Sequence, residues 1–281
     1  MIPKNFITEW RQYAPWTAAR MVEQDLIICR ALVDIFNQPD LRGSLAFRGG
    51  TAMFKLHMPA ARYSEDIDLV QVEPGPIGPL MDGIRRAFIP WLGEPKWKQT
   101  QGRVTLRYRF DSEDGVPLSL KIEINSREHF SLHGYQERPF IVGSRWFSGK
   151  ANILTYGLEE LLGTKLRALY QRKKGRDLFD LWHAFNGSGC APNPDRTISA
   201  FLQYMEQGGH QISRALFEQN LLGKREDPQF AGDIRPLLSA DTLWDFDEAF
   251  AFAMDTLAPC LPGEPWQGQQ SNEDDDGPRM R

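Results

Sequence analysis

Two aspartates one residue apart, Asp66 and Asp68, are the first residues of this chain whose spacing suggests chemistry. Their neighbours Ile67 and Leu69 are apolar, which indicates a β-strand, and residues two apart in a strand point to the same face of a sheet. Two carboxylates on one face repel each other unless a cation lies between them. Oxygen ligands of this kind suit Mg²⁺, which binds through one or two carboxylates together with substrate phosphates. On these residues alone, a solvated strand edge or a helix cap is the alternative.

A glycine turn precedes the two aspartates in the sequence. Gly49 and Gly50 would let the backbone come close to a ligand, and Thr51 could cap the helix-forming run that follows. The free N–H groups and the positive dipole end at a helix start suit a phosphate. The same three residues also occur in ordinary turns. Together with Asp66 and Asp68 they predict a site for phosphate and metal.

A third carboxylate lies on a later segment. Residues 104–111 and 118–125 alternate apolar and polar side chains, which predicts two half-buried strands joined by a loop. Glu123 lies on the polar face of the second strand. If that strand lies beside the strand of Asp66 and Asp68, the spacing of about 4.8 Å between neighbouring strands would bring all three acids together. A solvated glutamate is the alternative.

A cluster of positive charge follows a helical run that begins near residue 154. Six basic residues, with no acidic residue among them, occur between positions 165 and 176: Lys165, Arg167, Arg172, Lys173, Lys174 and Arg176. In one continuous helix Lys165, Arg172 and Arg176 would share a face, whereas a break at Gly175 would start a new helix. In either case the cluster could contact phosphates. A solvated face, or local salt bridges from Arg176 to Asp180 and from Lys173 to Asp177, is the alternative.

The composition is that of an ordinary globular protein. The 281 residues can form one large domain or two modest ones, and hydrophobic and charged fractions of 41% and 25% are typical. The net charge of −4 and the pI near 5.8 average over the basic segment. They therefore neither indicate nor exclude nucleic acid as a partner.

Cysteine spacing and the N-terminal sequence indicate in which cellular compartment the protein is expected. Cys29, Cys190 and Cys260 lie far apart, which argues against a disulfide framework or a zinc knuckle and fits a reducing compartment. The N-terminus has no apolar core followed by a small-residue cleavage site. No apolar run reaches the roughly 18 residues of a membrane span. We expect a cytoplasmic protein that does not contact a membrane.

Periodicity and turn residues predict the remaining elements. Helical spacing predicts a long helix ending near residue 36 with a shorter one before it, and residues 126–150 read as loop with one short strand at 140–142. From residue 262 the composition changes to Pro, Gly and Gln with an acidic run, which predicts a disordered tail. Further helices are predicted at 80–92, 159–170, 198–205, 212–222 and 242–257.

In this order, the segments resemble the AbiEii/AbiGii-type toxins, nucleotidyltransferases with the fold of DNA polymerase beta. The resemblance spans roughly residues 20–185. The residues that carry it are Arg-Gly-Gly-Thr-Ala at 48–52 with Lys55, Arg-Tyr-Ser-Glu-Asp-Ile-Asp-Leu at 62–69, Lys-Ile-Glu-Ile-Asn at 121–125, Lys-Leu-Arg-Ala-Leu-Tyr-Gln-Arg at 165–172, and Arg-Asp-Leu-Phe-Asp-Leu at 176–181.

The resemblance implies an α+β fold. Residues 1–150 would form the nucleotidyltransferase core with its N-terminal helices, a small mixed sheet flanked by helices. Residues 151–260 would form a mainly helical C-terminal domain that carries the basic segment, and residues 261–281 the disordered tail.

The resemblance also assigns roles to residues. The metal, Mg²⁺ with Mn²⁺ as a substitute, would be held by Asp66, Asp68 and Glu123, which with Lys165 would be the catalytic residues. The family has one more conserved aspartate, for which Asp233, Asp241 and Asp245 are the candidates. Nucleotide binding is implied for Gly49, Gly50, Thr51, Lys55, Ser64, Arg172, Arg176 and Asp177.

The expected function follows from the same resemblance. The chain would be a metal-dependent toxin of a toxin–antitoxin or phage-defence system that transfers NMP from an NTP to RNA, at the 3′ end of tRNA, and releases pyrophosphate. A cognate antitoxin encoded nearby would be its partner. Two alternatives stay open: transfer of the nucleotide to a protein or small hydroxyl acceptor, and an inactive module that binds RNA or a partner.

Overall fold

A mixed sheet forms the centre of the N-terminal half in the computed structural model, which describes residues 2–268. The seven strands lie in the order β3-β4-β5-β2-β1-β7-β6. The pairs β1 with β7 and β2 with β5 are parallel, and the other neighbours are antiparallel. The strands are β1 Leu45–Arg48, β2 Asp66–Gln71, β3 Lys96–Thr100, β4 Arg103–Asp111, β5 Pro117–Asn125, β6 Gln136–Gly143 and β7 Ser148–Thr155.

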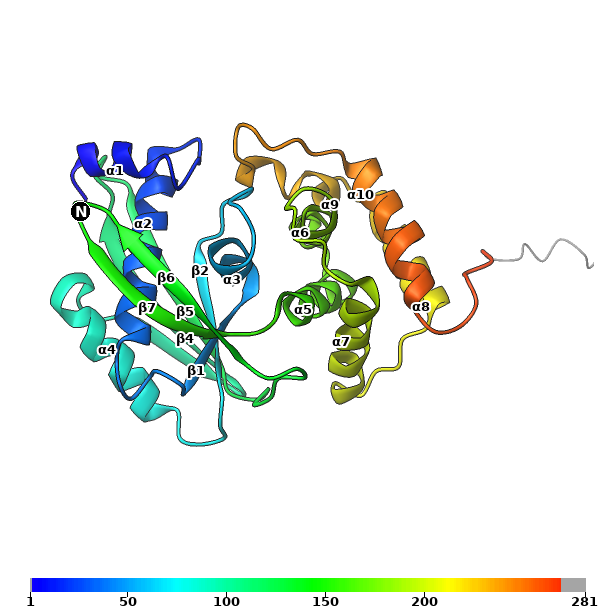
Figure 1. The fold of residues 1–281 in the computed structure, drawn as a ribbon, viewed down its shortest axis with the longest axis horizontal. Helices are drawn as coiled ribbons and strands as arrows, with labels where there is room; N and C mark the ends of the chain where they lie inside the picture. The colour runs from blue at the N-terminus through cyan, green and yellow to red at the C-terminus, as the bar shows by residue number, and fades with distance from the viewer. Residues whose placement is uncertain (1, 269–281) are drawn as a thin grey trace, which may run out of the picture.

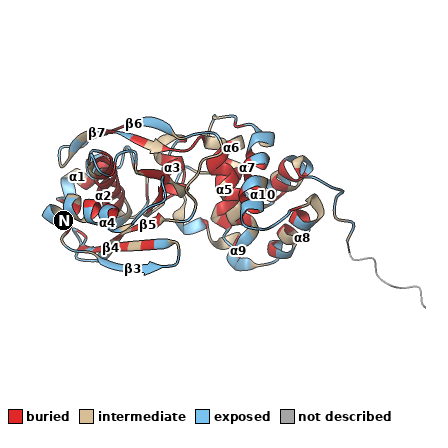
Figure 2. Cartoon of the chain, turned by 90° about the horizontal axis from the view of Figure 1, so that it is seen from below, coloured by how far each residue is buried: buried red, intermediate tan, exposed pale blue. Residues whose placement is uncertain are grey.

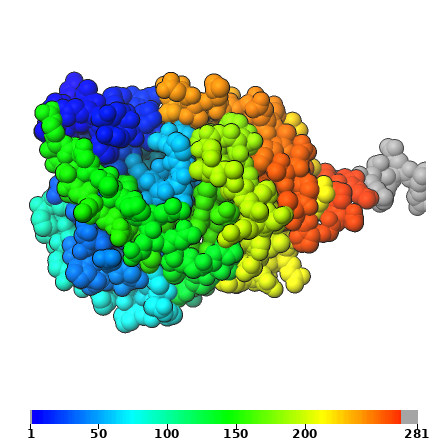
Figure 3. Space-filling view, in the orientation of Figure 1, coloured from blue at the N-terminus to red at the C-terminus, as the bar shows by residue number. Residues whose placement is uncertain are grey.

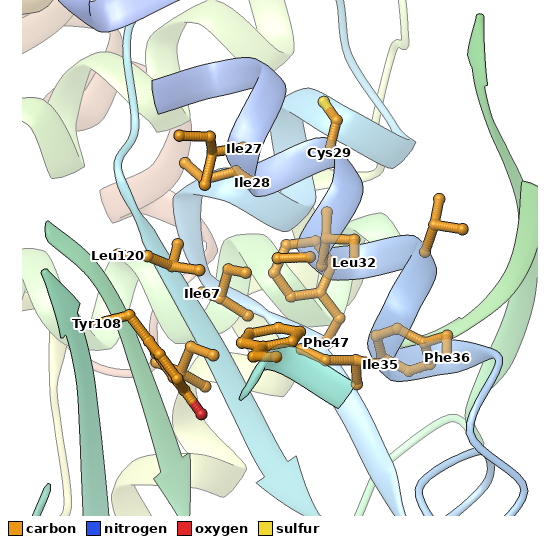
Figure 4. Packing of buried hydrophobic residues seen from close by; sticks show 14 of the residues in the cluster. Ile27, Ile28, Cys29, Leu32, Ile35, Phe36, Phe47, Ile67, Tyr108 and Leu120 are labelled. Atoms are coloured by element: carbon orange, nitrogen blue, oxygen red, sulfur yellow. The ribbon is translucent and has the colours of Figure 1, made fainter. Parts of the chain in front are cut away.

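Helices α2 (Ala19–Phe36) and α4 (Gly78–Leu92) cover one face of the sheet, with the short α1 (Lys4–Trp10) beside α2 (Figure 1). Leu32 and Ile35 of α2 pack over Phe47 of β1 and Ile67 of β2 (Figure 4). Burial of these side chains, each worth roughly 1.5–3 kcal/mol, holds the strands that carry the predicted site. The predicted pair of N-terminal helices is confirmed.

The opposite face of the sheet meets α3 and a layer of C-terminal helices (Figure 1). Ala46 and Val70 of the sheet pack in one core with Met53 of α3 and Leu162 of α5. The helices are α3 Gly49–Leu56, α5 Leu158–Gln171, α6 Gly175–Asn186, α7 Pro194–Gln207, α8 Arg214–Arg225, α9 Pro228–Gly232 and α10 Phe246–Phe252.

The segment after α9 crosses back to the loop before β2, as the space-filling view shows (Figure 3). The backbone N–H of Tyr63 donates to the carbonyl of Leu237 at 2.7 Å. The hydroxyl of Thr242 donates to the carbonyl of Ala61 at 2.9 Å. These bonds fix the loop that leads into Asp66.

Three strands depart from the sequence prediction, and the first, β6, begins at Gln136 and so extends beyond the short strand predicted at 140–142. β7 begins in residues predicted as loop and continues past the predicted domain boundary at 150. Its only buried apolar side chains are Ala151 and Ile153, so the alternation of apolar and polar residues along it is too short to predict a strand. β3 has all five residues exposed (Figure 2). It is an edge strand that pairs with β4 alone through backbone hydrogen bonds. Because these bonds do not involve side chains, the strand has no hydrophobic pattern in the sequence.

The C-terminal helices follow the prediction with smaller differences. The helix predicted at 242–257 begins at Phe246 and ends in a π-helical turn over Ala253–Leu257. Within residues 2–268 no helix has the length and apolar character of a membrane span. The predicted disordered tail lies outside the described residues from position 269 onward, so it stays a prediction.

Candidate active site

The predicted neighbourhood of the acidic strands is confirmed. Strands β2 and β5 pair in parallel, with Asp66 opposite Lys121 and Asp68 opposite Glu123. Ile67 is fully buried under α2. Because side chains alternate along a strand, Asp66 and Asp68 point to the other face, toward α5.

The glycine turn brings the protein's own side chains close to the backbone. Gly49 has a φ of +82°, and a Cβ at this position would lie 2.3 Å from Oδ2 of Asp68. A Cβ on Gly50 would lie 2.4 Å from a guanidinium nitrogen of Arg62. The sequence suggested that these glycines admit a ligand. In the structure they leave room for Asp68 and Arg62, and each glycine also lines one of the two hollows described below.

Thr51 does not cap α3, contrary to the prediction. The helix begins at Gly49, so Thr51 is its third residue. Its side chain is buried, and its hydroxyl donates to the carbonyl of Asp66 at 2.6 Å and lies 2.8 Å from Oγ of Ser64. Thr51 therefore positions Ser64 and the start of β2 and does not face a nucleotide.

Lys55 does not fit the predicted contact with a nucleotide. Its Nζ lies 2.6 Å from Oδ2 of Asp25, inside the interface between α2 and α3. The indole N–H groups of Trp10 and Trp16 donate to the same carboxylate. The lysine neutralises a buried acid, away from Asp68.

Helix α5 ends at Gln171 and α6 starts at Gly175, so the basic segment is divided between two helices and does not form one continuous helix. A Cβ on Gly175 would lie 2.0 Å from the carbonyl oxygen of Phe230, which explains the glycine. The local salt bridges considered from the sequence do not form. Instead Arg176 lies 3.8 Å from Asp233 and Lys173 lies 3.5 Å from Asp227.

A buried ionic network lies under the cleft. Nζ of Lys165 lies 2.8 Å from Oδ2 of Asp180 and 3.2 Å from Oδ1 of Asp177. Arg62 donates two hydrogen bonds to Asp180, at 2.5 and 2.7 Å, and Arg172 donates two to Asp177, at 2.7 and 2.9 Å. Burial acts to raise the pKa of Asp180, but Arg62 and Lys165 outweigh it and hold that pKa at about 2. Asp180 therefore stays ionised at neutral pH.

The predicted direct contact of Asp177 with a nucleotide does not fit its position. Its side chain is fully buried, and both carboxylate oxygens are engaged by Arg172 and Lys165. Its effect on a ligand would come through those two cations, which it orients. Among the three candidates for the last family aspartate, Asp233 lies beside Arg176, whereas Asp245 caps α10.

Two hollows flank the carboxylates. The Ser64 hollow, about 290 Å³, is lined by residues that include Gly50, Ser64, Asp66, Lys121 and Arg176. The Arg48 hollow, about 230 Å³, is lined by residues that include Arg48, Gly49, Asn125 and Arg167. Since a liquid water occupies about 30 Å³, each hollow has room for a phosphate group. Both share the same central residues: Asp68, Arg103, Glu123, Lys165 and Arg172.

Lys121 supplies a cation between two of the predicted metal ligands. Its Nζ lies 2.9 Å from Asp66 and 3.2 Å from Glu123. Within residues 2–268 no three His, Cys, Asp or Glu side chains are grouped as a metal site, so the predicted ligand set is not assembled in this geometry. Burial, and then the carboxylate of Asp66, raise the pKa of Asp68. The carboxylate oxygens of Asp66, Asp68 and Glu123 are the donor type that Mg²⁺ prefers, but Lys121 would have to withdraw and the three side chains would have to close together to hold it.

Sequence reasoning named Glu123 and Arg167 as candidates but did not assign a role at the site to Lys121, Arg62, Arg48, Asp180 or Glu128. Lys121 and Glu123 are two apart on one strand, so their shared face was a usable signal. Arg62 and Asp180 are 118 positions apart, and nothing in the sequence pairs them. Arg48, Arg167 and Glu128 also meet only through the fold.

Comparisons with known proteins identify the family and the fold of the chain. The family described as "Nucleotidyl transferase AbiEii toxin, Type IV TA system" matches residues 30–252. MenT4, a nucleotidyltransferase toxin from Mycobacterium tuberculosis, has a similar structure, with 18% identity, a TM-score of 0.61, and 92% of this chain and 90% of that chain covered. JHP933 from Helicobacter pylori has 18% identity and a TM-score of 0.54, with 86% and 91% covered. These structures show the shared fold. No curated protein sequence matches the chain.

Proposed function

This chain belongs to the AbiEii nucleotidyltransferase toxin family of type IV toxin–antitoxin systems, and we propose that it transfers NMP from an NTP to the 3′ end of an RNA, with tRNA as the acceptor and pyrophosphate as the leaving group. One observation carries the proposal. Asp66, Asp68 and Glu123 share a cleft with cations from α5 and α6. Acids that can hold a metal beside cations that can hold phosphates are what phosphoryl transfer requires.

The Ser64 hollow suits the triphosphate of the NTP. Its cations include Lys121, Lys165, Arg172 and Arg176, and the hydroxyl of Ser64 and the start of α3 add hydrogen-bond donors. Lys165 and Arg172 are held in place by buried acids, so they need little reorganisation to stabilise charge on the departing pyrophosphate. Arg172 is half exposed, which leaves part of its guanidinium free for a phosphate.

The reaction would proceed at the carboxylates. The acceptor hydroxyl oxygen forms a bond to the α-phosphorus as the bond from that phosphorus to the pyrophosphate oxygen breaks. Asp66 and Asp68, with Glu123 beside them, would hold Mg²⁺ or Mn²⁺, whose charge offsets that of the attacking and leaving oxygens. Glu123 would either take the proton from the hydroxyl or share this metal, in which case the proton would pass to solvent water.

Incubation of the purified protein with each α-labelled NTP, Mg²⁺ and total RNA tests the proposal. Label that nuclease removes supports transfer to RNA, whereas label that only protease removes would show a protein acceptor. No labelling would support the alternative of an inactive binding module.

Variants connect the labelling to the carboxylates. Asp66→Ala and Asp68→Ala should each abolish labelling, and undiminished labelling in either would refute the metal assignment. Asp114→Ala, which removes an exposed aspartate in the loop between β4 and β5, is the matched control and should label normally.

We also propose that a cognate antitoxin encoded beside this chain neutralises it in the cytoplasm. The toxin–antitoxin family supports this partner. Co-expression of the neighbouring gene should restore growth to cells that express the toxin. Growth arrest that persists with every neighbouring gene would contradict it.

A further inference from the structure

Two arginines from opposite sides of the cleft converge on one carboxylate. Arg48 ends β1, Arg167 lies on α5, and Glu128 lies in the loop 126–135 between β5 and β6. Nη1 of Arg48 lies 2.6 Å from Oε2 of Glu128. Arg167 donates two hydrogen bonds to the same carboxylate, at 2.7 and 3.3 Å. All three side chains are about one-fifth exposed, so the cluster is reachable from solvent.

Both arginines line the Arg48 hollow, next to Asp68 and Glu123. A nucleotidyl transfer brings two substrates to opposite sides of the reacting phosphorus. If the Ser64 hollow holds the triphosphate, as the proposed function requires, the Arg48 hollow lies where the acceptor strand must approach. Arg103, which is 62% exposed, adds a further cation there.

The chemistry of the pair selects a phosphate. A guanidinium presents paired N–H donors that match two oxygens of a carboxylate or of a phosphodiester equally well. Burial acts to raise the pKa of Glu128, but the hydrogen bond from Arg167 and the charge of Arg48 outweigh it and hold that pKa at about 2. Glu128 therefore stays an anion at neutral pH, as a phosphodiester does.

The loop that carries Glu128 can exchange it for another anion. Asn125 accepts hydrogen bonds from the backbone N–H groups of Arg127 and Glu128 at 2.8 and 3.1 Å, which forms a local turn. This turn holds the loop without the two arginines. Phe130, partly buried in the same loop, packs on the ring of Tyr204, over which Arg167 also lies. An aromatic ring beside a phosphate site is typical of single-stranded nucleic-acid binding.

We infer that Arg48 and Arg167 form a binding site for a backbone phosphate of the acceptor RNA, and that the carboxylate of Glu128 occupies this site until the RNA displaces it. The inference rests on the proposed function for its choice of RNA. Glu128 would then compete with the acceptor RNA for binding to the two arginines.

Opposite effects of two variants test the inference. Binding of a 5′-fluorescein single-stranded oligoribonucleotide with a free 3′-OH is measured by anisotropy across a salt series. Arg167→Gln should weaken binding roughly fivefold at about 0.1 M salt and lower the salt slope by about 0.7, the value for one phosphate contact with a single strand. Glu128→Gln should tighten binding, because the competing anion is gone.

Controls separate the site from folding and from the donor. Arg138→Gln removes an exposed arginine of β6 and should leave RNA affinity unchanged. Arg167→Lys keeps the charge and should recover part of the affinity. A fluorescent NTP analogue should bind all variants equally, and the KM for RNA should follow the binding data while the KM for NTP stays constant.

The outcomes are distinct. If Glu128→Gln weakens RNA binding as Arg167→Gln does, the cluster is structural and the inference is wrong. Equal RNA affinity in wild type and both variants would also overturn it. If the wild type never labels RNA, the proposed function fails, whereas opposite shifts in RNA affinity would still support the phosphate site.

Discussion

Replacing Gly49 by alanine tests whether the glycine turn serves the carboxylate of Asp68. Gly43 offers a matched control, since it lies at a φ of +83° against +82° for Gly49, and a Cβ there meets nothing within 4 Å. The positive φ alone costs an alanine about 1–2 kcal/mol at either position. Any further effect at Gly49 must come from its surroundings.

The added Cβ at Gly49 would lie 2.3 Å from Oδ2 of Asp68, whereas ordinary contacts begin at 3.4 Å. Asp68 must therefore move by on the order of 1 Å, a displacement that can cost about 100-fold in rate when a reacting group is involved. We expect Gly49→Ala to label acceptor about 100-fold more slowly than wild type, and Gly43→Ala to keep its rate.

Urea denaturation and labelling kinetics, measured on both variants, decide the result. The free energy of unfolding should fall by a similar amount of about 1–2 kcal/mol in each. Equal labelling rates in the two variants would refute the reasoning, because the contact with Asp68 would then have no effect. A much larger loss of stability in Gly49→Ala would show that the carboxylate resists displacement and strains the fold.

Three further predictions concern charged groups. Asp180→Asn leaves the buried Arg62 without its counter-ion and should lower the free energy of unfolding by roughly 3–5 kcal/mol in urea. The folded-state pKa of Asp180 is about 2, and its ordinary value is 3.8. The stabilisation from its ionised form is therefore present above about pH 4 and disappears as the pH falls toward 2. Over this interval the free energy of unfolding of wild type should fall more steeply than that of Asp180→Asn. Lys121→Met removes the cation between Asp66 and Glu123, so Mg²⁺ should raise the melting temperature of this variant more than that of wild type; equal shifts would contradict the proposed metal ligands.

The acidic strands were predictable because a strand has a period of two. Ile67 and Leu69 must enter the core under α2, so Asp66 and Asp68 must face the other way. Alternation also identified β4 and β5, and with β5 it placed Glu123 on a polar face. The resemblance of the motifs to a known family gave the fold, which the family match and the neighbouring structures confirm.

The pairing of charges was not predictable from these patterns. Lys121 has Glu123 two positions away in the sequence and pairs with it in the cleft, whereas Lys55 has no acid nearby in the sequence and pairs with Asp25 in the core. The strand β3 escaped prediction because an exposed edge strand needs no apolar residues.

The sequence by itself determined most of the elements and the face on which Asp66, Asp68 and Glu123 lie, because backbone periodicity and burial act over a few residues. Only the tertiary structure decided which charges meet. Arg62 reaches Asp180, and Arg48 with Arg167 reaches Glu128, through the packing of the sheet against α5 and α6. An ion pair depends on distance in space and on shielding from water, and neither follows from separation along the chain.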